Sequence, residues 1–233
     1  MPNLLLLHGA LGAIDQMEGL RRALTPDFEV YAFNFAGHGG RPLPEDGLHI
    51  GAFAQELADF LDANQLEEVH LFGYSMGGYV ALSLLQHYPE YETRIGRIAT
   101  LGTKFDWSPE SAEREAGMLN ADVLEQKVPK FVEMLQKRHA PADWRALLEA
   151  TAAMLRRLGN GEAFDMEDLA SIEHPVLILR GELDNMVGAD ESENAAAFLP
   201  NGEFQELPAT KHPLEQVDAA MLAEVLKAYF YTA

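Results

Sequence analysis

The chain of 233 residues contains no cysteine. This absence excludes a disulfide framework, a thiolate metal site and a cysteine nucleophile, and it fits the reducing cytoplasm in which we expect the protein to lie. No apolar run approaches the roughly 20 residues that a membrane-spanning helix needs. The N-terminus leads directly into the apolar residues 4–7 without the basic region of a signal peptide. We therefore expect no membrane insertion.

Positive charge is also scarce. The chain has 17 Lys and Arg against 37 Asp and Glu, which gives a formal net charge of −20. This balance argues against binding to nucleic acid or to anionic membranes. The apolar share of 48% and the length are ordinary for one globular domain with a substantial core. A small-molecule substrate is therefore the expected partner, and the oligomeric state is left open.

Short apolar segments alternate with amphipathic ones along most of the chain. The apolar segments that predict buried strands are residues 4–7, 29–35, 69–74, 95–101, 175–179 and 203–207. Helical spacing occurs in residues 14–24, 50–63, 76–87 and about 215–230. This alternation predicts an α/β fold with a doubly wound, mostly parallel sheet of about six strands in a three-layer α/β/α arrangement. Residues 29–35 are expected toward one edge of the sheet.

Residues 103–168 interrupt this alternation. They contain no convincing strand and carry apolar residues at helical spacing. Pro109 and Pro141 both suit the first turn of a helix. We expect a helical cap here, inserted before the penultimate strand of a single domain whose core comprises residues 1–102 and 169–233. Because ligands bind at the carboxyl ends of parallel strands, the cap is expected to cover the site.

The sequence Gly73-Tyr74-Ser75-Met76-Gly77 lies where the strand 69–74 passes into the helix 76–87. This is the G-x-S-x-G pattern of a nucleophile elbow, a strained turn that exposes one serine hydroxyl above a sheet edge. Glycine is needed on both sides because a side chain would collide within so tight a turn. The pattern predicts Ser75 as a nucleophile.

A serine hydroxyl needs a base to take its proton, and histidine is suited to this at neutral pH. His212 lies in the loop after the last predicted strand, at the same sheet edge as Ser75. Asp184 follows the preceding strand and is expected to accept the other ring N–H of His212. Glu182 is the alternative acceptor.

The reaction also needs donors for an oxyanion. One is expected to be the backbone N–H of Met76, which follows the nucleophile. The other should come from the loop after the first strand, and we expect the N–H of Ala10, with that of Leu11 as the alternative. His8 is expected to support this loop rather than to catalyse. His38 is expected to belong to a structural turn.

Together these segments resemble the α/β-hydrolase fold superfamily over nearly the whole chain. The matching motifs are His8-Gly9-Ala10-Leu11-Gly12, Ala36-Gly37-His38-Gly39, the elbow with Gly78, Gly181-Glu182-Leu183-Asp184 and Lys211-His212. The resemblance implies a serine hydrolase with a cap between the sixth and seventh strands of the family's sheet. The chain departs from the family in starting at the third strand, in its short cap and in Lys211, where glycine is frequent.

The expected reaction is hydrolysis of a carboxylic ester through an acyl-enzyme on Ser75. The loops also resemble those of the SHCHC synthases, which are lyases, but Tyr79 stands where those enzymes tend to carry an arginine for substrate carboxylates. Thioesterase, lactonase and C–C hydrolase activities remain alternatives for the same residues. A ligand-binding protein without catalysis is the third possibility.

Several residues are candidates for lining a substrate pocket beneath the cap. They are Leu11, Phe105, Trp107, Met118, Phe131, Met134 and Met154. No cluster of His, Asp and Glu has the spacing of a metal site, and no glycine pattern fits a nucleotide cofactor. We therefore expect neither a metal nor a cofactor.

Overall fold

The computed structural model describes residues 1–231 and contains one six-stranded sheet in which every neighbouring pair is parallel. The strand order is β2-β1-β3-β4-β5-β6. The strands are β1 (Asn3–Leu7), β2 (Glu29–Ala32), β3 (Val69–Tyr74), β4 (Ile95–Leu101), β5 (Val176–Gly181) and β6 (Gly202–Leu207). The predicted parallel sheet of six strands is confirmed.

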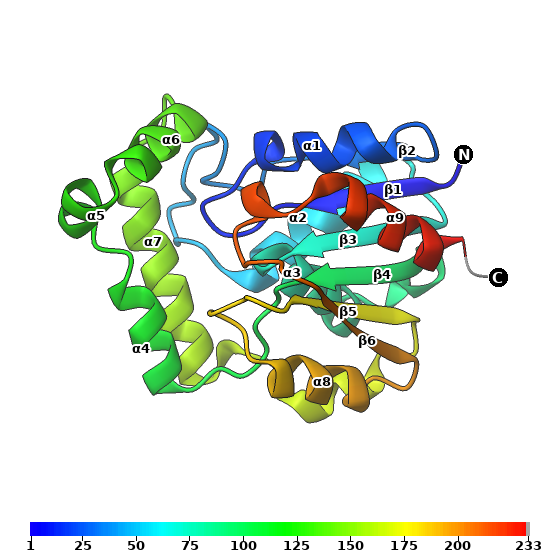
Figure 1. Ribbon diagram of the computed structural model, residues 1–233. Coiled ribbons are helices and arrows are strands. Elements are labelled where there is room, and N and C mark those ends of the chain that lie inside the picture. The colour runs from blue at the N-terminus through cyan, green and yellow to red at the C-terminus, as the bar shows by residue number, and fades with distance from the viewer. Residues whose placement is uncertain (232–233) are drawn as a thin grey trace.

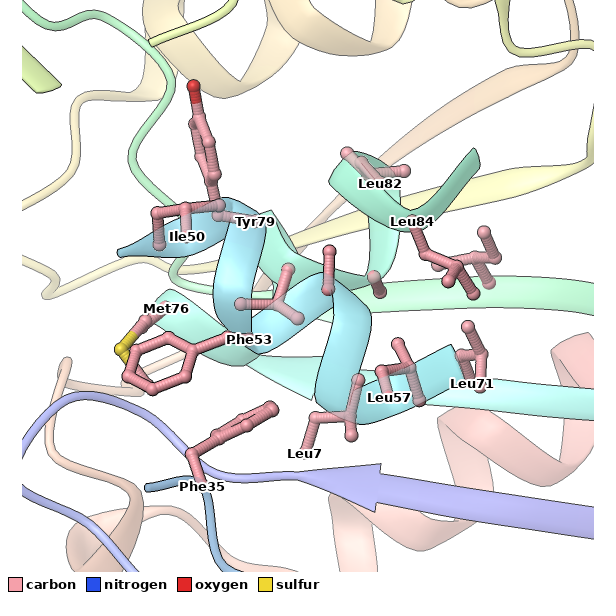
Figure 2. Close-up of a cluster of buried hydrophobic side chains, with 14 of the residues drawn as sticks. Leu7, Phe35, Ile50, Phe53, Leu57, Leu71, Met76, Tyr79, Leu82 and Leu84 are labelled. Atoms are coloured by element: carbon pink, nitrogen blue, oxygen red, sulfur yellow. The ribbon is translucent and has the colours of Figure 1, made fainter. Parts of the chain in front are cut away.

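Helices cover both faces of the sheet, as Figure 1 shows. Leu4 and Leu6 of β1 pack with residues of α1 (Ile14–Leu24) and α9 (Ala219–Phe230). Leu5 and Leu7 point to the other face, since side chains alternate along a strand. They join the cluster formed with α2 (Ile50–Ala63), α3 (Met76–His87) and α8 (Ala189–Phe198), part of which Figure 2 shows. Burial on both faces explains why these strands are continuously apolar.

Strand β2 is shorter than predicted. It ends at Ala32 rather than at residue 35. The backbone N–H of Phe35 donates to His8 Nε2 at 3.1 Å, and the Asn34 side chain accepts from the N–H of Ile14 at 2.7 Å. Phe35 itself is fully buried. After Ala32, hydrogen bonds with side chains thus replace the backbone hydrogen bonds of a strand. The apolar pattern of the sequence alone does not indicate this difference.

The C-terminal helix also begins later than predicted. A short 3₁₀ turn (Leu214–Gln216) precedes α9, which starts at Ala219. The side chain of Asp218 caps this helix by accepting from the N–H groups of Ala220 and Met221 at 2.9 and 3.1 Å. Helix α8 has no clear signal in the sequence, because its buried face consists only of small residues.

The insertion between β4 and β5 forms the helices α4 (Pro109–Gly117), α5 (Ala121–Lys127), α6 (Pro129–His139) and α7 (Trp144–Arg157). Figure 1 shows these helices beyond the carboxyl ends of β3 and β4. Helix α4 starts with the predicted Pro109, whereas α7 starts three residues after Pro141 because Asp143 caps it by accepting from the N–H of Arg145 at 2.8 Å.

The longest helices, α2 and α7, have 14 residues each. Within residues 1–231, no helix has both the length and the apolar character needed to cross a membrane.

Candidate active site

Ser75 lies at the tip of a turn between β3 and α3. Its φ of +51° and ψ of −116° are strained values for a residue with a side chain. The Ser75 N–H donates to the carbonyl of Leu101 at 2.8 Å, and its carbonyl accepts from Thr103 Oγ1 at 3.0 Å. These two bonds hold the strained residue in place from the neighbouring strand β4 and the loop that follows it.

The glycines of the elbow stand where no side chain fits. A Cβ on Gly73 would lie 2.3 Å from the backbone nitrogen of Gly78. A Cβ on Gly77 would lie 2.3 Å from the carbonyl oxygen of Leu7. Both contacted atoms belong to the backbone, which cannot move aside as the end of a flexible side chain could. The start of α3 therefore packs on the end of β1 at a distance that only glycine permits.

Replacing Gly77 by alanine is expected to lower the free energy of unfolding by about 3 kcal/mol, because the added methyl group would overpack against Leu7. Gly51 is the matched control. It lies in α2, where a Cβ added to it would have no atom within 4 Å. Gly51→Ala should therefore raise the free energy of unfolding by about 0.5–1 kcal/mol. Urea unfolding followed by circular dichroism measures both. Equal effects at the two positions would contradict the packing account of the elbow.

Asp184 and His212 meet at the same sheet edge. His212 Nδ1 lies 2.7 Å from Asp184 Oδ2, to which it donates, and both residues are buried. Asp184 Oδ1 accepts from the N–H groups of Met186 and Val187 at 2.8 and 3.0 Å. Burial by itself would raise the pKa of Asp184, but the hydrogen bond and charge of His212, with the two amides, lower it. The carboxylate is thus ionised and fixed, and it orients the imidazole.

Glu182, the alternative acceptor, has another partner. Its Oε2 accepts from the N–H of Ala209 at 2.7 Å, and the residue is exposed. The loop that carries His212 is also fixed from β3, since Tyr74 donates its hydroxyl to the His212 carbonyl at 3.0 Å. Ser75 and His212 line the same cavity.

Two backbone amides beside Ser75 are available to a ligand. Among the described residues, the Ala10 N–H donates to no protein acceptor. Met76 is the first residue of α3, so its N–H has no acceptor within the helix. The Met76 side chain packs beside Phe53 in the core (Figure 2). The Leu11 N–H, the alternative donor, already donates to His38 Nε2 at 3.3 Å.

Two buried histidines hold the Leu11 peptide in place. His38 Nδ1 donates to the Ala36 carbonyl at 2.9 Å, which leaves Nε2 free to accept from Leu11. His139, at the end of α6, accepts on Nδ1 from the N–H of Gly39 at 3.0 Å and lies with Nε2 3.0 Å from the Leu11 carbonyl. The backbone of Leu11 has a φ of +58° and follows directly after Ala10. The insertion therefore contacts the loop that carries the free amide.

His8 has the supporting position that was expected of it. Its Nδ1 donates to the Gly9 carbonyl at 2.8 Å, and Nε2 accepts from Phe35. Burial lowers the pKa of His8 to about 4, and burial also lowers the pKa values of His38 and His139. Each ring uses one nitrogen as donor and the other as acceptor, so the fold needs all three in the neutral form.

Acid is therefore expected to destabilise the protein below pH 6.5. The unfolded chain binds a proton on each of these histidines at a higher pH than the folded chain does, so stability falls as the pH drops. For His8 alone the loss is about 2 kcal/mol between pH 7 and pH 5. Urea unfolding at both pH values measures it. Replacing the exposed His87 by glutamine should leave this loss unchanged. A stability independent of pH in this range would contradict the assignment of neutral rings.

A cavity of about 380 Å³ opens beside Ser75. Its walls are mainly apolar and come from the sheet edge and from the insertion. Of the candidate pocket residues, the structure places these at the cavity: Leu11, Trp107, Met118, Phe131, Met134 and Met154. Phe105 lies elsewhere, buried with its ring 6.4 Å from each of the rings of Tyr79 and Phe164. It is part of the core beneath the insertion.

Sequence reasoning missed other residues of the cavity. They include Gln16, Ile50, Lys104, Glu115, Arg138, Met186 and Glu215. Met186 and Glu215 lie two and three residues from Asp184 and His212, and that proximity could have indicated them. The other missed residues come from separate helices and a loop, and no local sequence pattern indicates that they lie near Ser75. Within residues 1–231, no group of three or more His, Asp and Glu side chains is placed to hold a metal ion.

Comparison with known proteins adds three findings. A family model described as alpha/beta hydrolase fold matches residues 2–154. A relative from Pseudomonas savastanoi pv. phaseolicola, named as the carbamate hydrolase RutD, is 29% identical over 227 residues, with 87% of this chain and 83% of the relative covered. The carboxylesterase YbfK of Bacillus subtilis is 26% identical over 210 residues, with 85% and 70% covered.

The fold is also found among solved structures. The crystal structure of NosK from Streptomyces actuosus superposes with a TM-score of 0.82 at 20% sequence identity, covering 100% of this chain and 98% of that one. At this identity the likeness concerns the fold alone. The sequence relatives, both named as hydrolases, add the general class of reaction.

Proposed function

Because the chain belongs to the α/β-hydrolase fold family, we propose that it is a serine hydrolase that cleaves carboxylic esters through an acyl-enzyme on Ser75. The observation that carries this proposal is the hydrogen bond of 2.7 Å between His212 and Asp184 at the cavity that Ser75 lines. A buried carboxylate paired with an imidazole beside a strained serine is an arrangement that activates a hydroxyl.

In the proposed reaction, His212 takes the hydroxyl proton of Ser75 through Nε2 as the oxygen attacks the ester carbonyl. Asp184 holds the ring through Nδ1 and stabilises the imidazolium that forms. The amides of Ala10 and Met76 donate to the oxyanion. His212 then gives its proton to the leaving alcohol, and a water molecule, activated by the same base, releases the acid.

Residues 103–168 are proposed to act as the cap over this site. This segment contributes Met118, Phe131, Met134 and Met154 to the cavity wall. An apolar wall excludes water and favours an apolar acyl chain or alcohol. The identity of the substrate therefore depends mainly on the insertion, whereas the bond-breaking groups belong to the core.

Carbamate hydrolysis is a second candidate, favoured by the name of the RutD relative. The same groups would attack a carbamate carbonyl, which differs from an ester in the nitrogen beside it. The lyase alternative lacks such support. Tyr79, at the position where an arginine would hold carboxylates, is buried, and its hydroxyl accepts from the N–H of Phe164 at 2.9 Å.

The test is a panel of p-nitrophenyl butyrate, an N-alkyl p-nitrophenyl carbamate and a butyryl thioester. We expect the highest kcat/KM for the ester, with a burst of p-nitrophenol equal to the enzyme concentration if release of the acid is slow. Faster turnover of the carbamate would favour the second candidate. A folded protein that turns over none of the three would contradict the proposal and favour a ligand-binding role.

A further inference from the structure

Four charged side chains line a cavity whose walls are otherwise mainly apolar. They are Lys104, Glu115, Arg138 and Glu215. An ionised group of a substrate loses hydration when it enters such a cavity, and this loss is costly unless a group of opposite charge replaces it. The charge that the site accepts therefore depends on which of these four side chains lacks a partner within the protein.

Arg138 is held by two carboxylates of the protein. Its side chain is only 5% exposed, its Nε lies 2.9 Å from Asp15, and its Nη2 lies 2.9 Å from Glu215. Its Nη1 donates to the Leu11 carbonyl at 3.4 Å. Two carboxylates thus share one guanidinium, and every nitrogen of the group has an acceptor. The single positive charge of Arg138 is therefore already balanced by two carboxylates of the protein.

Lys104 is also held by the protein. Its Nζ lies 3.7 Å from Glu191 Oε2 and 5.4 Å from the ring centroid of Trp107. The Lys104 side chain is 14% exposed and that of Glu191 is 12% exposed. Glu191 is fixed in turn by the N–H groups of Phe105 and Asp106, which donate to its Oε1 at 2.6 and 2.7 Å. The ammonium therefore has a carboxylate and an aromatic face as partners already.

Glu115 differs from both cations because its charge is not balanced inside the cavity. It lies on α4 and is only 7% exposed. Its nearest cation is Arg114, whose Nη2 is 3.7 Å away and whose side chain is 64% exposed. An ion pair with so exposed a partner is weak and screened by solvent. Glu115 thus adds an uncompensated negative charge to a wall whose two cations are already paired.

We infer that this cavity rejects acyl chains that end in a carboxylate, and that Glu115 is a residue that determines this specificity. The inference rests on the proposed ester hydrolysis and names its substrate class. That class consists of esters whose acyl chain is uncharged or ends in a cation. A carboxylate would lose its hydration, meet two cations whose charges are already balanced by protein carboxylates, and face Glu115, whereas an ammonium group would be attracted to Glu115.

The test compares three p-nitrophenyl esters with the same leaving group and a six-carbon acyl chain: the hexanoate, the 6-aminohexanoate and the mono-adipate. They end in a methyl group, an ammonium and a carboxylate. We expect kcat/KM for the hexanoate to exceed that for the mono-adipate by at least about 100-fold. The decisive quantity is the kcat/KM for the 6-aminohexanoate divided by that for the mono-adipate, because the acyl chains of both esters end in one charge and these charges have opposite signs.

In Glu115→Gln, this ratio is expected to fall by about tenfold, since the variant removes the charge and keeps the shape. Glu113 provides the matched control on the same helix. Its side chain is 62% exposed and pairs with Arg156 at the surface, so Glu113→Gln should leave the ratio unchanged. A ratio near one in the wild-type protein, or the same ratio in Glu115→Gln as in the wild type, would overturn the inference.

A binding measurement distinguishes a failure of this inference from a failure of the proposed ester hydrolysis. Calorimetric titration with hexanamide and with adipamic acid compares a neutral with an anionic ligand and needs no catalysis. Preference for hexanamide without hydrolysis of any ester would contradict the proposed function and retain the charge selection. Rapid hydrolysis of all three esters would retain ester hydrolysis and overturn the charge selection.

Discussion

Ser75→Ala is expected to lower kcat/KM for p-nitrophenyl butyrate by about 10⁴- to 10⁶-fold. The substitution removes the oxygen that is proposed to attack the carbonyl, and it leaves the cavity, His212 and the free amides in place. The residual rate would come from positioning and from the oxyanion donors. The measurement is the initial rate of p-nitrophenol release at saturating and subsaturating ester, with circular dichroism to establish that the variant is folded.

Ser83→Ala is the matched control for this experiment. Ser83 lies on the same helix, α3, and is buried, and its Oγ has no hydrogen-bond partner among the described residues. Its loss should leave the rate unchanged. Unchanged turnover in Ser75→Ala would assign the nucleophile to another group, and a loss of activity in both variants would indicate damage to α3 rather than to the chemistry.

Asp184→Asn is expected to lower kcat/KM by about 10³- to 10⁴-fold. The side-chain oxygen of the introduced amide can still accept from the N–H groups of Met186 and Val187, so its NH₂ group would face His212. That NH₂ group cannot accept a hydrogen bond from Nδ1. The imidazole would then hold its proton on Nε2, the nitrogen that must accept from Ser75, and would act poorly as a base. The measurement is again the initial rate of p-nitrophenol release.

Glu182→Gln is the control for Asp184→Asn, because Glu182 was the alternative hydrogen-bond acceptor for His212. Glu182 Oε2 accepts from the N–H of Ala209 at the surface, and the variant should retain activity within about threefold, as surface substitutions usually do little. A large loss in Glu182→Gln together with a small one in Asp184→Asn would reverse the two assignments and contradict the proposed geometry.

The sheet was predictable from the sequence because its signals are local. Continuous apolar residues between amphipathic segments indicate strands buried on both faces, and the glycines around Ser75 indicate a turn whose packing tolerates no side chain. Element ends were less predictable. Strand β2 stops at Ala32 because His8, far away in the sequence, accepts the Phe35 amide that would otherwise extend the ladder.

The surroundings of the site depend on contacts between distant segments, and no sequence pattern indicates them. His139 contacts the Leu11 carbonyl across 128 positions of the chain. Arg138 forms ion pairs with Asp15 of α1 and with Glu215 of the 3₁₀ turn that precedes α9. Helical spacing showed that the insertion would form helices, but not which of its side chains would face Ser75. For that reason Phe105 was expected at the cavity although it belongs to the core.

Covalent labelling tests the central claim, that Ser75 is an activated nucleophile, most directly. The wild-type protein is incubated with a fluorophosphonate probe, digested and analysed by mass spectrometry. The account predicts one phosphonyl adduct on Ser75, absent in Ser75→Ala and retained in Ser83→Ala. A folded wild-type protein that carries no adduct, or carries it on another residue, would contradict the account.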